Sequence, residues 1–235
     1  MSFLQYFQLS VLVGLSLVVY MPAGLCAQEA NKKISITVCA TDIVGDLNTL
    51  HLASGGKPAA KTLKWLDIPL NVFTVSQPIE VIGPRTLNFL AAATLDSPPV
   101  ASAAIPGDAT SYLLVFVPNK DANGYRIIPI AEPDFPYGSY FLVNCSKVRL
   151  AVSIGDQKKL LKPGEQANVA GANGKSQDVN IHASIHDEVR LIRSTRWQLD
   201  ENQREVVLFY SQTDSDLVGS KHIMAMRAAD GKPER

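Results

Sequence analysis

From residue 31 onward, short runs of β-branched and aromatic residues alternate with turn residues. The clearest run is Val148 to Ile154, in which even-numbered positions are apolar and odd-numbered positions are small or polar. Successive side chains of a strand point to opposite faces, so this period of two predicts an antiparallel strand with one buried face.

The rest of the chain repeats this pattern without sustained helical periodicity, and the pairs Asn123-Gly124 and Asn173-Gly174 favour tight turns. Strands and turns recur about every ten residues, which predicts an all-β fold, an antiparallel β-sandwich of immunoglobulin-like type. The expected strands are 33–41, 47–53, 61–66, 71–76, 79–83, 86–93, 111–118, 124–131, 139–145, 147–154, 157–162, 179–186, 189–199, 204–212 and 221–227.

Residues 1–27 have the pattern of a secretory signal peptide, with an apolar run, the breakers Pro22 and Gly24, and small residues up to Ala27. We expect cleavage after Ala27. The alternative is an uncleaved anchor, but the run from Leu9 to Tyr20 is shorter than the roughly 20 residues of a spanning helix. The sequence therefore predicts an exported protein, periplasmic or extracellular.

We expect one β-sandwich domain over residues 30–227, followed by a disordered tail at 228–235. Residues 96–110 are rich in Pro and Ala, which indicates a long surface loop or a seam between two lobes. A single domain is favoured because the part before this segment is small and weakly patterned. No internal repeat of fixed period is visible.

Composition fits this interpretation and narrows the function. Apolar residues make up 46% of the 235 positions, enough for a core, and 22 Lys and Arg balance 22 Asp and Glu. A neutral chain lacks the basic excess of nucleic-acid-binding proteins and of polybasic membrane-surface proteins. No later segment is apolar enough to span a membrane.

Loss of the signal peptide would leave two cysteines, Cys39 and Cys145. In an oxidising compartment they could form a disulfide. The alternative is two separate small buried residues, because Cys39 shares its strand face with Ser35 and Thr37.

No motif in the chain predicts a metal site, a cofactor or a catalytic residue. His182 and His186 have the spacing of a zinc helix, but their neighbours predict a strand, on which they would lie roughly 13 Å apart. The run Asn119 to Gly124 resembles the start of a calcium loop, but position twelve of that loop would be Ile130. A hairpin explains this run fully.

A basic and aromatic patch, formed by Arg190, Arg193, Arg196 and Trp197, is the candidate ligand site. It could hold an acidic glycan or a partner's carboxylate. The alternative is a solvated sheet face whose arginines pair with Asp and Glu.

The run Phe135 to Cys145, the strand Val148 to Ile154, Gly155-Asp156 and Lys162 to Glu165 together resemble a pattern of uncharacterised secreted bacterial β-sandwich proteins. The resemblance covers about thirty residues, 135–165, and implies an immunoglobulin-like sandwich with no known function.

We therefore expect a non-catalytic binding or structural protein of the bacterial cell envelope, whose partner is another envelope protein or a glycan. The alternatives are a secreted hydrolase with a spatially assembled site and an assembly chaperone that donates a strand. An enzyme needs a pocket with ionisable groups, whereas strand addition needs an unprotected sheet edge.

Overall fold

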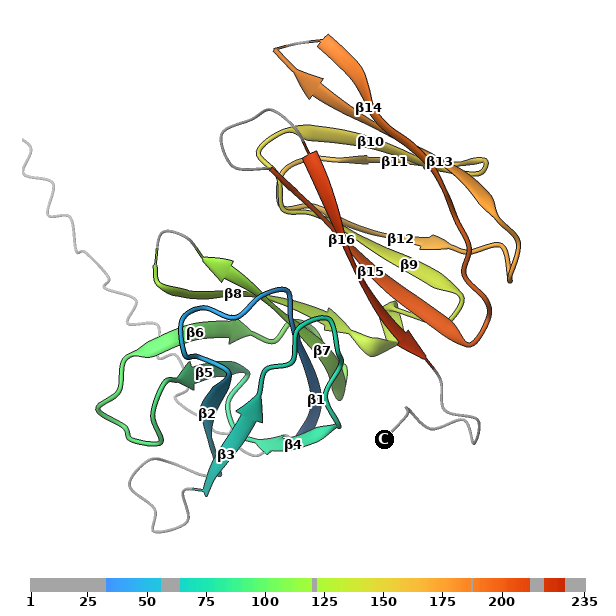
Figure 1. Ribbon diagram of the computed structural model, residues 1–235. Helices are drawn as coiled ribbons and strands as arrows, with labels where there is room; N and C mark the ends of the chain where they lie inside the picture. Colours follow the sequence, from blue (N-terminus) through green and yellow to red (C-terminus); the bar gives the residue numbers. More distant parts are fainter. Residues whose placement is uncertain (1–32, 56–63, 120–121, 187, 212–217, 227–235) are drawn as a thin grey trace, which may run out of the picture.

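A computed structural model describes residues 33–55, 64–119, 122–186, 188–211 and 218–226 (Figure 1). The expected signal peptide and C-terminal tail lie outside these ranges. Within them the protein is all-β, as the sequence predicts, with one short 3-10 helix, η1 (Glu132–Asp134). Its sixteen strands are β1 (Lys33–Ala40), β2 (Thr49–Ser54), β3 (Lys64–Pro69), β4 (Ile79–Ile82), β5 (Thr86–Leu90), β6 (Pro99–Ala104), β7 (Ser111–Asn119), β8 (Gly124–Ala131), β9 (Ser139–Asn144), β10 (Arg149–Ile154), β11 (Gln157–Leu161), β12 (Gln166–Ala170), β13 (Gln177–Ile185), β14 (Glu188–Trp197), β15 (Gln203–Ser211) and β16 (Val218–Met226).

The strands form two successive sandwiches (Figure 1). In the first, sheet β4-β1-β7-β8 packs on sheet β3-β2-β5-β6; in the second, sheet β12-β9-β15-β16 packs on sheet β11-β10-β13-β14. Each sandwich has its own buried apolar cluster, built around residues such as Phe116 in the first and Phe209 in the second.

The two sandwiches share one topology. When the strands of each are numbered one to eight, both have the sheet orders 4-1-7-8 and 3-2-5-6. In both, strands one and seven pair in parallel, and all other pairs are antiparallel. A matching main-chain bond ends the first strand: Thr41 N donates to Phe116 O, and Cys145 N donates to Phe209 O.

This duplication escapes a search for a fixed period because the spacing drifts along the chain. Thr41 and Cys145 are 104 residues apart, whereas Phe116 and Phe209 are 93 apart. Loops of unequal length absorb the difference, so the repeat exists in space and not as a constant interval in sequence.

The two sandwiches meet through the same face of the same sheet. Along β7, Leu114 and Phe116 enter the first core, while Leu113 and Val115 face a third buried cluster. This third cluster, here called the interface cluster, combines residues of both sandwiches: Cys39, Leu113, Val115, Ile128, Ile130, Phe135, Phe141, Val143, Val206, Leu208 and Ile223. Burial on both faces explains why β7 and β15 are continuous apolar runs and not alternating ones.

Polar contacts tie the sandwiches together beside η1. Arg204 of β15 donates to Glu132 Oε1 at 2.7 Å and to Phe135 O at 3.1 Å. Its guanidinium lies over the ring of Phe135, 5.0 Å from the centroid, and over that of Tyr137, 4.7 Å away. On β16, Lys221 Nζ donates to Thr41 O of the first sandwich at 3.1 Å.

These observations correct the expected domain organisation. Residues 30–227 contain two sandwiches and not one, and the division falls at η1 and not at 96–110. The segment 96–110 contains β6, which pairs with β5 and packs along β8. Its small residues have a structural reason, because Ala101 and Ala103 are buried in the first core and a side chain at Gly124 would overlap the Val100 carbonyl.

Candidate functional site

A gap in one sheet of the first sandwich creates a pocket. Strands β2 and β5 pair through only two residues of β2, His51 and Leu52. The equivalent strands of the second sandwich, β10 and β13, pair along all of Arg149–Ile154. Among the described residues, the same fold therefore closes this sheet in one half of the protein and leaves it open in the other.

The end of β2 diverges because it bonds to the opposite sheet. Ser54 is buried, and its Oγ accepts a hydrogen bond from Ile82 N of β4 at 3.0 Å. Gly55 N then donates to Ile82 O at 2.8 Å. These bonds hold the end of β2 against β4 and away from β5.

The edge of β5 faces the gap with its main chain. Ile105 N donates to Arg85 O at 2.7 Å, which fixes the alternation of the β5–β6 ladder. In an antiparallel ladder, successive residues direct their main-chain groups to opposite sides. The N–H and C=O groups of Thr86 and Asn88 therefore point away from β6, and β2 provides no register partner for residues 86–88.

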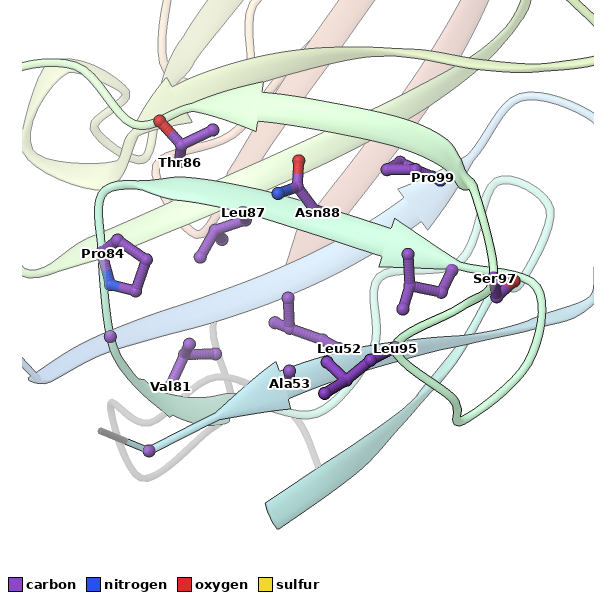
Figure 2. A pocket seen from close by; sticks show the side chains of 13 residues that line it. Leu52, Ala53, Val81, Pro84, Thr86, Leu87, Asn88, Leu95, Ser97 and Pro99 are labelled. Atoms are coloured by element: carbon purple, nitrogen blue, oxygen red, sulfur yellow. The ribbon is translucent and has the colours of Figure 1, made fainter. Parts of the chain in front are cut away.

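The pocket has a volume of about 320 Å³ and an aliphatic lining (Figure 2). Its lining residues come from β2, β4, β5, the start of β6 and the segments between them: Leu52, Ala53, Gly55, Val81, Gly83, Pro84, Thr86, Leu87, Asn88, Leu90, Leu95, Ser97 and Pro99. None of these carries an ionisable side chain. Leu95 is 58% exposed, so a large apolar side chain stands in solvent at the pocket.

The four residues of the expected basic patch have different partners in the structure. Arg190 pairs with Glu188 at 2.5 Å and Arg196 pairs with Asp178 at 2.8 Å. Both members of each ion pair are exposed. Arg193 instead donates to Ser220 Oγ on β16 at 3.1 Å. The alternative of surface ion pairs describes Arg190 and Arg196, and a shared ligand site of the four residues stays a prediction.

Trp197 turns toward the second core. Its ring lies 5.3 Å from that of Tyr140 and 5.1 Å from that of His222, measured between centroids. The aromatic member of the expected patch therefore belongs to the packing between β9, β14 and β16.

The expected hairpins and cysteines also have clear outcomes. His182 lies on β13, as predicted, and His186 is in the following turn with φ 48°. Among the described residues, no group of three His, Cys, Asp or Glu side chains could hold a metal ion. Part of the calcium-like run, residues 120–121, lies outside the described residues.

Cys39 and Cys145 are free thiols, so the possible disulfide between them is not formed. Cys39 is fully buried in the interface cluster, and burial raises the pKa of its thiol to about 12. Cys145 packs against the same cluster, and burial raises its pKa too. The structure thus shows the alternative, in which both act as small buried residues.

Sequence reasoning missed a polar cluster on the core-facing side of the second sandwich. Ser220 Oγ lies 3.1 Å from His222 Nε2, and His222 Nδ1 lies 3.1 Å from Glu205 Oε1. The predicted strand 221–227 contains His222 but begins after Ser220, whereas β16 begins at Val218; on this longer strand the spacing of two places both side chains on one face. The contribution of Glu205 depends on the pairing of β15 with β16, which sequence does not show.

In the part of the chain that the structure describes, no helix is long and apolar enough to cross a membrane. Comparison with models of known protein families and with curated protein sequences found no match. The function must therefore be argued from these sites.

Proposed function

We propose that this protein is an exported binding protein of the bacterial cell envelope, and that the pocket of the first sandwich holds an extended, aliphatic segment of another envelope polypeptide. One observation carries the proposal: the sheet that is closed in the second sandwich is open in the first, beside an aliphatic pocket. Export is supported by the signal-like pattern of residues 1–27.

An extended segment matches both parts of the site. Strand addition combines main-chain hydrogen bonds to a sheet edge with pockets for alternate side chains. Thr86 and Asn88 offer main-chain groups at the gap, and the pocket beside it is aliphatic, with Leu95 as its exposed apolar side chain. Ligand pockets usually range from about 300 to 1,000 Å³, so this one suits one or two aliphatic side chains.

The lining also favours binding over chemistry. Nucleophilic and acid–base catalysis need ionisable or hydroxyl groups held by partners. Ser97 and Thr86 are the hydroxyl residues among the lining side chains, and no ionisable residue stands among them. The described lining can therefore recognise a segment, and it contains no general base with which to transform one.

The test is fluorescence anisotropy with a fluorescein-labelled peptide of alternating Val and Thr, seven residues long. Leu95→Asp places a charge at the exposed leucine of the pocket, and Gly83→Trp adds a large side chain where a Cβ meets nothing within 4 Å. Loss of a leucine contact is worth about 1.5–3 kcal/mol, so we expect at least a tenfold weaker affinity for Leu95→Asp.

Leu160→Asp is the matched control, because Leu160 is 67% exposed on β11 of the second sandwich. It should bind like the unmodified protein. Equal binding of the peptide by the Leu95 and Leu160 variants would refute the assignment of the pocket. So would equal binding of an alternating Ser and Thr peptide, which lacks the aliphatic side chains.

A further inference from the structure

The polar cluster of the second sandwich has the connectivity of a nucleophile, a base and an orienting acid. Ser220 and His222 lie on β16, and Glu205 lies on the neighbouring strand β15. Both hydrogen bonds of the imidazole measure 3.1 Å, one to the serine hydroxyl and one to the carboxylate. A nucleophile within reach of a base, which a third group orients, is the diagnostic arrangement for covalent catalysis.

Glu205 determines which imidazole nitrogen is free. A carboxylate only accepts, so the Nδ1–H of a neutral His222 donates to it, and Nε2 keeps its lone pair toward the Ser220 hydroxyl. The Glu205 side chain is 10% exposed and that of His222 is 31% exposed. The carboxylate is therefore shielded, while the imidazole and the serine beside it remain within reach of a solute.

Arg193 adds a cationic donor beside the nucleophile. Its Nη1 lies 3.1 Å from Ser220 Oγ, although it comes from β14 of the other sheet. In the first sandwich the equivalent strands β6 and β8 pack along each other, whereas β14 and β16 meet through side chains, from Arg193 to Ser220 and from Trp197 to His222. Ser220 therefore lies at the side of the second sandwich where side chains of β14 and β16 connect the two sheets, and it is partly exposed.

The first sandwich shows that the fold does not need polar residues at these positions. By the register of strands seven and eight, Glu205, His222 and Ser220 correspond to Tyr112, Pro129 and Ile127. The first sandwich uses an aromatic residue and two apolar ones there. Glu205 is buried, and a buried charged group costs stability unless it is paired, so the presence of these polar residues at only one of two equivalent sites indicates a role beyond folding.

We infer that Ser220, His222 and Glu205 form a catalytic triad that cleaves small esters at the side where β14 and β16 meet. This activity lies beyond the proposed function and uses a different sandwich. It corresponds to the alternative of a hydrolase with a spatially assembled site.

In the acylation step, Ser220 Oγ forms a bond to the ester carbonyl carbon, and the hydroxyl proton passes to His222 Nε2. The carbonyl electrons move onto oxygen, where Arg193 is placed to donate a hydrogen bond. When the carbonyl re-forms, the bond to the alcohol oxygen breaks, and the alcohol takes the proton from His222. Water then attacks the acyl-serine in the same way, which releases the acid and restores the serine.

The first measurement is covalent labelling of the full chain by diisopropyl fluorophosphate, followed by intact mass and peptide mapping. We expect one adduct per chain, located on Ser220 and absent in Ser220→Ala. His222→Gln removes the base and should slow labelling at least 100-fold. Ser153→Ala is the control, because the Ser153 hydroxyl on β10 donates to the main-chain Asn180 O at 3.4 Å; this variant should label normally.

The second measurement is hydrolysis of p-nitrophenyl acetate by the same variants. Glu205→Gln and Arg193→Gln should lower turnover roughly tenfold or more while circular dichroism and thermal unfolding show folded protein. Leu160→Asp, which lies in neither of the two proposed sites, should leave both labelling and turnover unchanged. The triad is refuted if folded protein gives no Ser220 adduct, or if His222→Gln labels as fast as the unmodified chain.

Discussion

Replacement of Phe135 by alanine should lower the free energy of unfolding more than replacement of an exposed aromatic residue does. Phe135 lies between the sandwiches, directly after η1, and only 1% of its surface is exposed. Its ring meets the ring of Phe141 at 5.5 Å between centroids, with an interplanar angle of 63°, and the Arg204 guanidinium lies 5.0 Å away. All of these side-chain contacts disappear in Phe135→Ala.

The expected cost can be worked from these contacts. Truncation of a buried phenylalanine to alanine typically costs about 3–5 kcal/mol, of which an aromatic pair contributes about 0.5–1.5 kcal/mol. The bond from Arg204 to Phe135 O involves the main chain and is retained in the variant. We therefore expect a loss of about 3–5 kcal/mol, a large share of the about 5–15 kcal/mol that stabilises a typical protein.

Urea unfolding can assign this loss to the interface, because each sandwich has one tryptophan. Trp65 lies on β3 of the first and Trp197 on β14 of the second, and the chain has two in all. Trp197→Phe leaves a probe of the first sandwich, and Trp65→Phe leaves a probe of the second. Both sandwiches contribute to the burial of the interface cluster, so the two tryptophan probes should report the same urea midpoint in the protein with Phe135. In Phe135→Ala the two midpoints should differ.

Phe73→Ala is the matched control. Phe73 is 41% exposed and lies beside Lys221, so its loss should cost less than about 1 kcal/mol. If Phe135→Ala costs no more than Phe73→Ala, or if both probes keep a common midpoint, the interface does not couple the two halves and the reasoning fails.

Two further outcomes test the packing. Gly124→Ala should lower the free energy of unfolding by about 1–3 kcal/mol, because the new Cβ would overlap the Val100 carbonyl. Gly83→Ala is the control, since a Cβ there meets nothing within 4 Å and should change thermal stability little. Equal effects of the two substitutions would contradict the close approach of β8 to β6. Burial raises the Cys39 pKa to about 12, above its unfolded value, so the stability it contributes is complete below about pH 8 and is lost as pH rises. Between pH 7 and 10, the urea midpoint of Cys39→Ala should therefore fall less than that of the unmodified protein, and parallel falls would exclude this linkage.

Sequence patterns predicted strands well wherever side-chain chemistry and burial agree. The predicted segment 124–131 coincides with β8, and 111–118 lacks only the last residue of β7. The Ala-rich strand β6 was missed because its small residues serve packing and not strand propensity. Residues 71–76 are not a strand, since Phe73 adopts φ 56° and only Val72 bridges to β1.

Two-sided burial was visible in the sequence, but its cause was not. The apolar run Leu113 to Phe116 indicates a strand covered on both faces, and only the structure shows that a second sandwich covers one of them. Turn chemistry was similarly incomplete. At Asn123-Gly124 the asparagine, and not the glycine, adopts the positive φ, of 42°. The glycine is required because a side chain at this position would overlap the Val100 carbonyl.

The site residues depend on relations that no local window contains. Asn144 and Ser146 match the pattern of a glycosylation sequon. In the structure Asn144 is fully buried, and its side-chain amide donates to Val148 O and Leu161 O. The pocket arises where Ser54 leaves one sheet for another, and the triad arises from a strand pairing. The pocket and the triad can therefore be recognised only once the strand pairing is known.

Equivalent faces that meet each other are the geometry of a symmetric homodimer, yet here one polypeptide supplies both subunits. In a true homodimer every substitution appears twice, so a gap opened on one side opens on the other. Covalent linkage removes that constraint and fixes the stoichiometry at one of each kind. The first sandwich can then keep its apolar pocket while the second carries the serine hydroxyl of the proposed triad. Neither sandwich has to repeat the change made in the other.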